Sequence, residues 1–541
     1  MPIPISGPTT ITEPGEYELV NDISGTIEIA ANDVTLNGNG YKVSNPYYYS
    51  IYIEGCSNIT IHNMTCQSSP YYYSIYIRWC SNITIHNMTC HDSYIGICLE
   101  GTSNTNIDNV NINNNRFGIY LIYSYNITIA NSAINDNYIG IELEDSSNNS
   151  IADSILSKNS VGIILGYSNN NSITGVTLSN NGIYVEESYN NTVTDTTVNG
   201  KPLVYFEGAE NLEIDETSNA GQVILVKCKN VTIKDLDINN ASVGVELLNC
   251  ERVSITNITL SNNSWFGIYL LDSDNNAINK ITANHNWTGI FLDYSNNNTI
   301  VNSTLSNNQN GITLRTSSGN NISNVNIKNC ILHGIYLSES SYNIVTNTII
   351  SDGQYVGIEL YMSDNNTIVN SKITNHVWSG IKLEGSGNNL IYNNYFNNMN
   401  NVEFYYYLPN TWNIEKTPGK NIVGGDYLGG NYWGKPDGTG FSDLAADNDN
   451  DGISDEPYIF IEDVDYPVES DVDWYPLVKP KVVEKTRLAP PPLPPLPKEE
   501  RVVVEKQTEI RRVPVVPEEL FVYGAVSAGM IPLILALLKR K

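Results

Sequence analysis

The phrase Gly96-Ile97-Cys98-Leu99 decides the fold, because near copies of it return about every 22 residues along the chain. In each copy apolar residues alternate with a variable residue, and this period of two predicts a β-strand with one buried face. A fixed repeat of this length predicts stacked units that bury their apolar faces only against their neighbours. The other copies begin at Gly118, Gly140, Gly162, Gly182, Gly244, Gly267, Gly289, Gly311, Gly334, Gly357 and Gly380.

A second short strand in each repeat is punctuated by Asn or Asp, as in Ile107-Asp108-Asn109 and Ile129-Ala130-Asn131. These residues tolerate the left-handed turn conformation, and stacked Asn amides can hydrogen-bond from coil to coil. Short strands without helical periodicity predict an all-β, right-handed, single-stranded parallel β-helix, a pectate-lyase-like solenoid of roughly 16 coils. We expect it to run without interruption from residue 5 to about 405. Its predicted interior row is Ile97, Ile119, Ile141, Ile163, Ile268, Ile290, Ile335, Ile358 and Ile381.

Charge excludes one class of partner. The formal net charge of the 541-residue chain is −29, which would repel phosphate along most of the solenoid, so no nucleic-acid partner is expected. Asn-x-Ser/Thr sequons are frequent; composition alone could produce them, and glycosylation of a subset is the alternative if the chain is extracellular. Examples stand at Asn58, Asn63, Asn126, Asn230, Asn257, Asn286 and Asn365.

An acidic stretch near residue 450 has the spacing of a calcium loop. Alternate carboxylates can converge on one hard cation, and Gly452 permits the sharp turn between them. The twelfth position would be Tyr458 instead of Glu, and no flanking helices are apparent, so a solvated acidic turn remains the alternative. We expect a structural calcium that holds a C-terminal cap, with the ligands Asp447, Asp449, Asp451, the carbonyl of Ile453, and Asp455.

The C-terminal part predicts a membrane anchor. Residues 520–538 carry no charge, and the basic residues Lys539-Arg540-Lys541 follow them. A run of 19 uncharged residues predicts one membrane helix, and the basic end places the C-terminus in the cytoplasm and the large domain outside the cell. A buried soluble helix is the alternative. The opening residues lack a signal-peptide pattern, so we expect a mis-assigned or trimmed start. The predicted divisions are 1–45 (N-terminal cap and first coil), 46–405 (repeats), 406–478 (C-terminal cap with the acidic loop), 479–519 (Pro-rich and charged linker), 520–538 (membrane helix) and 539–541 (basic tail).

Several further segments carry a family resemblance. The chain opens with Thr9-Thr10-Ile11-Thr12-Glu13-Pro14-Gly15, has Asn199-Gly200-Lys201-Pro202-Leu203 in its middle, and ends its repeats with Gly430-Asn431-Tyr432-Trp433 before the acidic loop. In combination with the repeats, these segments resemble NosD-type right-handed β-helix proteins, which overlap the carbohydrate-binding and sugar-hydrolysis class and are abundant on archaeal cell surfaces. The resemblance covers about residues 5 to 478. It implies fold and surface location, and it places no copper ligands on matching positions here.

Aromatic residues two positions before the repeated Gly suggest a function. Outward aromatic rings flanked by Asn and Asp can stack on sugar rings and bind their hydroxyls, so we predict polysaccharide binding along one edge of the solenoid. Alternatively, the chain is a structural envelope spacer or adhesin whose Tyr residues only favour strands. A polysaccharide hydrolase or lyase is the third hypothesis; outward pairs such as Glu359 with Lys382 exist, but no catalytic residues are assigned. The candidate binding residues are Tyr94, Tyr138, Trp265, Trp287, Tyr355 and Trp378.

Overall fold

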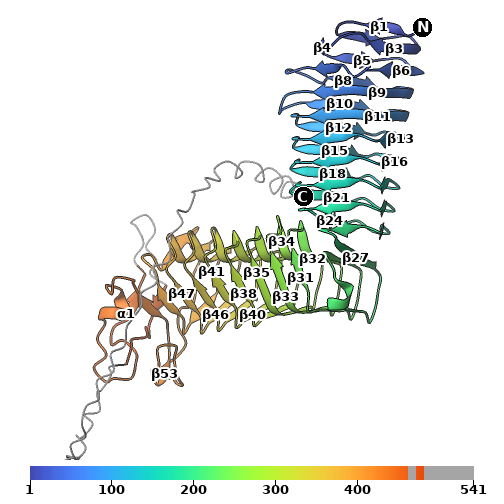
Figure 1. Ribbon diagram of the computed structural model, residues 1–541. Coiled ribbons are helices and arrows are strands. Elements are labelled where there is room, and N and C mark those ends of the chain that lie inside the picture. Colours follow the sequence, from blue (N-terminus) through green and yellow to red (C-terminus); the bar gives the residue numbers. More distant parts are fainter. Residues whose placement is uncertain (461–470, 481–541) are drawn as a thin grey trace, which may run out of the picture. The chain divides into compact units, whose positions relative to one another are not determined.

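The computed structural model describes residues 1–460 and 471–480, which fold as a right-handed parallel β-solenoid of about 18 turns. This confirms the all-β class and adds turns to the roughly 16 expected. Sheet B holds the Gly-Ile-x-Leu strands of the first half of the chain, and Figure 1 shows its strands stacked in sequence order. Its strands are β2 (Thr9–Ile11), β5 (Ile27–Ile29), β8 (Ile51–Glu54), β10 (Tyr73–Arg78), β12 (Ile95–Glu100), β15 (Phe117–Ile122), β18 (Ile139–Glu144), β21 (Val161–Gly166) and β24 (Ile183–Glu186).

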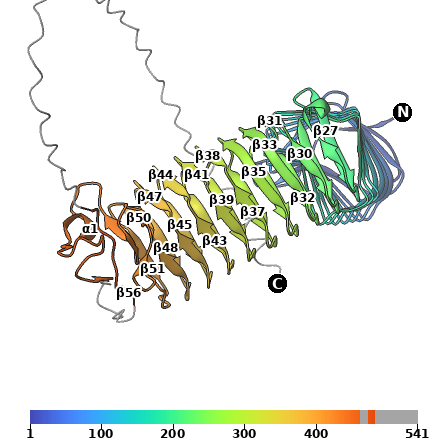
Figure 2. The ribbon, with the colours of Figure 1, turned by 90° about the horizontal axis from the view of Figure 1, so that it is seen from below.

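The same repeat forms sheet C in the second half of the chain. Figure 2 shows its strands following one another, coil by coil, toward the C-terminal cap. Each strand pairs in parallel with the equivalent strand of the next coil. The strands of sheet C are β27 (Lys201–Glu207), β29 (Gln222–Val226), β32 (Val243–Leu248), β34 (Phe266–Leu271), β36 (Thr288–Asp293), β39 (Asn310–Arg315), β42 (His333–Ser338), β45 (Val356–Tyr361), β48 (Ser379–Glu384) and β51 (Val402–Tyr405).

Left-handed residues turn the chain at fixed places in each coil. In the coil that begins with β15, these residues are Tyr123, Asn126, Asn131 and Asp136, with φ between 49° and 55°. Most such positions along the chain hold Asn or Asp, because a short polar side chain tolerates this conformation best. The predicted outer ladder forms as well, since Asn109 Nδ2 donates to Asn87 Oδ1 at 2.6 Å.

A second Asn ladder lies inside the coils and was not predicted. The Nδ2 atoms of Asn115 and Asn137 donate to the Oδ1 atom of the Asn in the next coil, both at 3.1 Å. The same oxygen also accepts the backbone N–H of the preceding ladder residue at 2.9 Å. These bonds satisfy buried polar groups at a corner where the backbone leaves the sheet.

The core confirms the predicted register. All nine isoleucines of the expected interior row have 0% exposed surface. In sheet B, Ile97, Ile119, Ile141 and Ile163 pair directly from coil to coil. Since successive side chains of a strand point to opposite faces, the residue after each Ile faces outward.

The stack is interrupted once, so the expectation of an uninterrupted β-helix is corrected. Val198 of β26 (Thr197–Val198) pairs antiparallel with Lys201 of β27, around Asn199 and Gly200, which have φ of 52° and 75°. Sheet B therefore ends at β24, and a new stack begins at β27. We call this region the junction.

Side chains of the second stack cover the open edge of β24. Gln222 Oε1 accepts the N–H of Ile183 at 2.9 Å, and Glu246 Oε1 accepts the N–H of Val185 at 2.8 Å. These edge donors would otherwise lack the partners that another strand provides. The junction is thus held by side chain to backbone bonds where the ladder stops.

The last coil is closed by a cap with few regular elements, including β54 (Tyr432–Gly434) and α1 (Phe441–Leu444). The indoles of Trp412 and Trp433 are buried and donate to carboxylates from residues 471–480: Trp412 to Asp471 at 3.0 Å, and Trp433 to Asp473 at 2.9 Å. Across residues 1–460 and 471–480, no helix has the length and apolar character needed to cross a membrane. The predicted membrane helix at 520–538 lies outside the described residues.

Candidate functional site

The outward face of sheet C carries polar and aromatic residues in one continuous row. The inward positions on either side of this row hold Ile, Val and Leu, which fixes the row on the outer face. Strand pairing aligns its members coil by coil. From β29 to β51 the row reads Ile224, Glu246, Tyr269, Phe291, Thr313, Tyr336, Glu359, Lys382 and Glu403.

Charged groups join at the C-terminal end of this row. Glu359 lies between two nitrogen groups: its Oε2 is 2.8 Å from His333 Nε2, and its Oε1 is 2.9 Å from Lys382 Nζ. Lys382 Nζ also contacts Glu384 Oε2 at 2.9 Å. The structure therefore brings together the predicted pair Glu359 and Lys382, and it adds His333 and Glu384, which were not predicted.

Two of the predicted aromatic residues border this charged group. The rings of Tyr355 and Trp378 lie 5.6 Å apart at 36°, and Tyr355 also contacts the His333 ring edge to face at 5.5 Å. Trp378 is 49% exposed, and its Nε1 donates to Glu403 Oε2 at 2.6 Å. We name this set the sheet C platform; it consists of His333, Tyr355, Glu359, Trp378, Lys382, Glu384 and Glu403.

The platform fixes the ionisation of its central carboxylate. Burial opposes ionisation of Glu359, but the hydrogen bonds and charges of His333 and Lys382 outweigh it and lower the pKa of Glu359. Burial also opposes the charge on Lys382, yet its bonds to Glu384 and Glu359 raise the pKa of its ammonium group. The pair is therefore a fixed anion and cation at neutral pH, suited to hydrogen bonding and not to proton donation.

The other aromatic candidates do not join the platform. Trp265 is only 6% exposed and lies edge to face against Tyr184 at the junction, so the expectation of an exposed indole there is corrected. The cause is the restart of the stack, which brings the faces of sheets B and C into contact. Trp287 is half-buried. Tyr94 and Tyr138 are half-buried beside sheet B, on either side of Arg116, whose guanidinium lies 5.7 and 5.8 Å from their ring centroids.

Three carboxyl groups with raised pKa values lie on the outward faces of β18, β24 and β32: Glu142 and Glu186 are half-buried, and Glu246 is buried. Burial, followed by repulsion from Glu144 and Glu186, raises the pKa of Glu142 to about 8. Burial also raises the pKa of Glu186 to about 7, although the charge of Arg315 opposes that rise. Glu246 is fully buried, and this raises its pKa despite the bond from Val185 N–H. Of the three, Glu246 has a direct role at the junction, where it accepts the Val185 N–H.

Part of the predicted calcium loop converges. One carboxylate oxygen from each of Asp447, Asp449 and Asp451 lies within 4.8 Å of the others. Gly452 adopts the left-handed conformation with φ of 87°, as the turn requires. Asp455 is not part of this group, and its Oδ2 accepts from Asn448 Nδ2 at 2.5 Å.

The predicted calcium loop makes two contacts with the rest of the cap. The ammonium group of Lys416 pairs with Asp451, and the side chain of Ile453 packs in the cap with Tyr432 and Leu477. Three carboxylates and a positive-φ glycine fit a hard cation that prefers oxygen ligands.

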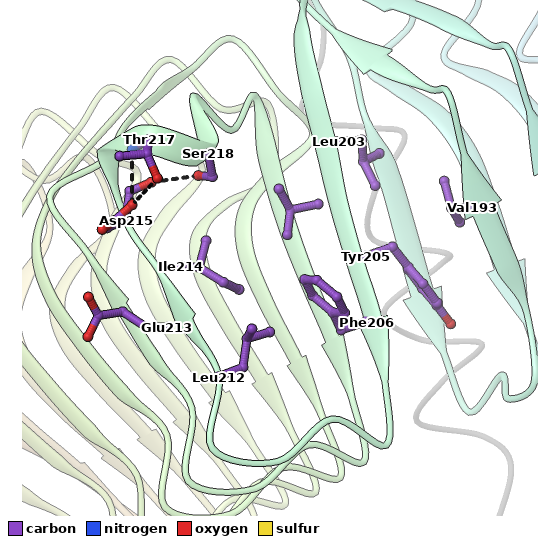
Figure 3. A pocket seen from close by; sticks show the side chains of 11 residues that line it. Val193, Leu203, Tyr205, Phe206, Leu212, Glu213, Ile214, Asp215, Thr217 and Ser218 are labelled. Carbon is purple, nitrogen blue, oxygen red and sulfur yellow. Dashed lines mark hydrogen bonds between the residues drawn. The ribbon is translucent and has the colours of Figure 1, made fainter.

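A separate pocket of about 330 Å³ opens where the second stack begins. Figure 3 shows Leu203, Leu212 and Ile214 around it, with Phe206 at its side. The polar groups Asp215 and Thr217 bond to each other at its rim. Its aliphatic lining is buried or half-buried and carries few polar groups, so we do not place the functional site there.

Comparison with known proteins identifies the repeats. Three overlapping segments, residues 25–178, 140–218 and 181–322, match the family model "Right handed beta helix region" and together cover more than half of the chain. Residues 279–438 match the model "Periplasmic copper-binding protein (NosD)". A search of curated proteins finds no match.

The converging carboxylates do not suit copper. Within residues 1–460 and 471–480, the converging group of three His, Cys, Asp or Glu side chains is Asp447, Asp449 and Asp451. Carboxylates are hard ligands, whereas copper prefers imidazole, thiolate and thioether groups. His376, within the segment that matches the copper-binding model, is buried, and its Nε2 lies 3.3 Å from the Ile350 carbonyl oxygen.

Three solved structures match this chain at low similarity. The periplasmic alginate epimerase AlgG is 13% identical over 65% of this chain and 77% of its own, with a TM-score of 0.26. The Azotobacter vinelandii mannuronan C-5 epimerase AlgE6 A-module is 13% identical over 68% and 88%, with a TM-score of 0.27. An alginate lyase from Paenibacillus sp. str. FPU-7 is 14% identical over 56% and 90%, with a TM-score of 0.24. Similarities this distant carry no argument about substrate or chemistry.

Proposed function

We propose that this chain, which belongs to the right-handed β-helix family, binds polysaccharide at the cell surface through the sheet C platform. The observation that carries the proposal is the exposed Trp378 ring beside Tyr355, with charged hydrogen-bonding groups on the next outward positions. A sugar ring has an apolar face that stacks on an aromatic ring and a rim of hydroxyls that need polar partners. The platform offers both within neighbouring coils.

The geometry favours binding over cleavage. Cleavage of a glycosidic bond requires a carboxyl group that donates a proton and a second one that acts as base or nucleophile. Glu359 is held as an anion by His333 and Lys382, so it has no proton to donate to a glycosidic oxygen. Lys382 Nζ occupies the space between Glu359 and Glu384, where a reacting atom would have to lie.

A glycan array probed with the full-length chain tests the proposal. We expect retention on one family of glycans, with no shortening of the bound chains after prolonged incubation. The absence of retention on every glycan would contradict binding and would favour a structural spacer or adhesin. Shortened chains would instead support a hydrolase or lyase.

We also propose that Asp447, Asp449 and Asp451 bind a structural calcium ion, with Asp455 and the carbonyl of Ile453 as further ligands. The support is the convergence of three carboxylate oxygens and the turn at Gly452. Calcium would offset the repulsion between these carboxylates and hold the loop against the cap.

For location, we propose that residues 520–538 anchor the chain in the cell membrane, with the solenoid outside and the C-terminus in the cytoplasm. The support is the uncharged run followed by Lys539-Arg540-Lys541. Membranes washed at high pH should retain the full chain and release a chain that ends at residue 519. Release of both would contradict the anchor.

A further inference from the structure

The charges of the sheet C platform point to the class of glycan that it accepts, and this inference rests on the proposed function. Three carboxylates, those of Glu359, Glu384 and Glu403, stand in adjacent coils of the same face. The fixed cation among them is Lys382. Even with His333 protonated, the negative groups outnumber the positive ones.

Lys382 is not available to a ligand anion. Its Nζ is bound at 2.9 Å by both Glu359 and Glu384, and it also lies 4.9 Å from the centroid of the Tyr405 ring. The side chain is 11% exposed. A ligand carboxylate could pair with this ammonium only by displacing a carboxylate that already binds it, which would leave a buried charge unpaired.

The next cation along sheet C is committed in the same way. Arg315 pairs with Asp293 through two of its nitrogens, with Nε 2.7 Å from Asp293 Oδ1. Asp293 is buried, so this pair is fixed in the junction. The face between Arg315 and Lys382 therefore offers a ligand acceptor groups and aromatic rings.

Sugar hydroxyls suit these acceptors, and sugar carboxylates do not. A hydroxyl can donate to Glu384 or Glu403, whereas a uronate or sulfate group would meet like charge at close range and lose its hydration. The net charge of −29 adds a repulsive field on approach. We propose that the sheet C platform selects neutral glycans and rejects acidic polysaccharides.

Matched polymers that differ only in charge test this selectivity. Polygalacturonate, alginate and hyaluronan are each compared with their carboxyl-reduced forms, beside a neutral glucan and mannan, by affinity electrophoresis of the full-length chain at fixed salt. Within any pair that is retained, we expect the neutral form to bind at least about tenfold more tightly, equivalent to ~1.4 kcal/mol. The double variant Glu384→Gln with Glu403→Gln should lower the ratio of the affinity for the neutral polymer to that for the acidic polymer. Each Gln keeps an oxygen that accepts hydrogen bonds but removes one negative charge.

The outcomes separate the inference from the proposed function. An acidic polymer that binds as tightly as its reduced form, or a ratio unchanged in the double variant, overturns the charge selectivity while glycan binding stands. Failure of every polymer to be retained overturns the proposed function, and with it the selectivity. Melting curves of the double variant, matched to those of the parent, establish that any change in retention arises at the platform.

Discussion

Glu142 and Glu246 show how one repeat position acquires different chemistry along the same solenoid. Both occupy the outward position of their strands, as Lys382 does, but Glu246 is fully buried at the junction and Glu142 is half-buried beside Glu144 and Glu186. Their folded-state pKa values are raised because the charged form loses hydration without gaining a counterion. The folded chain therefore holds protons that the unfolded chain releases.

This proton uptake makes stability depend on pH. Glu142 ionises near its ordinary value of 4.5 when unfolded and at about 8 when folded, so the free energy of unfolding should fall as pH rises between these values. Chemical denaturation across this window measures the fall. The variant Glu142→Gln should show a smaller decline, whereas Glu16→Gln, at an exposed position, should follow the parent. Equal declines in all three proteins would contradict the raised pKa of Glu142.

The buried Asn ladder predicts a local cost at Asn320. Its Oδ1 accepts the backbone N–H of Asn298 at 2.7 Å, and its Nδ2 donates to Asn343 Oδ1 at 3.1 Å. Asn320→Ala removes both bonds and leaves buried groups unpaired, which should destabilise the fold by about 2 kcal/mol. Denaturant unfolding measures this loss. Thr304→Ala, at an exposed strand position, should change stability little, and a similar loss in both variants would contradict the role of the ladder.

The same residues show what the sequence could and could not reveal. The interior row of Ile was predictable because a period of two and a fixed coil length decide which side chains face inward. The burial of Trp265 was not, because it depends on where the chain restarts at Asn199 and Gly200. The repeat places Glu384 and Glu403 on the outer face, and the sequence alone could have shown this. Their bonds, from Lys382 to Glu384 and from Trp378 to Glu403, depend on side-chain geometry that the repeat does not determine.

At the scale of elements, calcium binding by the loop around Asp449 can be tested by thermal unfolding. If calcium binds the folded chain and not the unfolded chain, it should raise the free energy of unfolding by about 2.7 kcal/mol at a free calcium concentration one hundred times Kd. Thermal unfolding with calcium and with chelator should therefore give a higher melting temperature with calcium. Asp449→Asn should reduce this difference, and Glu456→Gln, an exposed change in the same loop, should keep it. An unchanged melt in the parent would contradict calcium binding.

The junction is the element that most changes the expected molecule. A short antiparallel pairing of β26 with β27, at Thr197 with Pro202 and Val198 with Lys201, lies where sheet B has ended and sheet C begins. The side chains of Gln222 and Glu246 accept the backbone N–H groups at the edge of β24. The two stacks are therefore joined by these hydrogen bonds as well as by the continuous backbone. The sequence carried a signal for this change, since the Gly-Ile-x-Leu phrase is absent for close to three periods between Gly182 and Gly244.

For the whole molecule, the repeated coil separates stability from function. Inward positions are nearly uniform along the chain, so the core constrains the outward positions very little. Outward positions can therefore hold carboxylates in one coil and a Trp in another. In the sheet C platform, the exposed ring of Trp378 and the fixed charges of Glu359 and Lys382 occur in neighbouring coils.

Equilibrium binding by a pair of variants tests the central claim most directly. The full-length chain, its Tyr355→Ala with Trp378→Ala double variant and its Trp79→Ala variant are titrated with the glycan that the parent retains. Trp79 is 58% exposed but lies at the end of β10, in the first stack, so it controls for loss of an exposed indole. We predict that the double variant binds roughly tenfold more weakly or worse, since each stacked ring contributes about 0.5–1.5 kcal/mol, and that Trp79→Ala binds as the parent does. A double variant with the parent's Kd, or an equal loss in Trp79→Ala, would contradict the sheet C platform as the binding site.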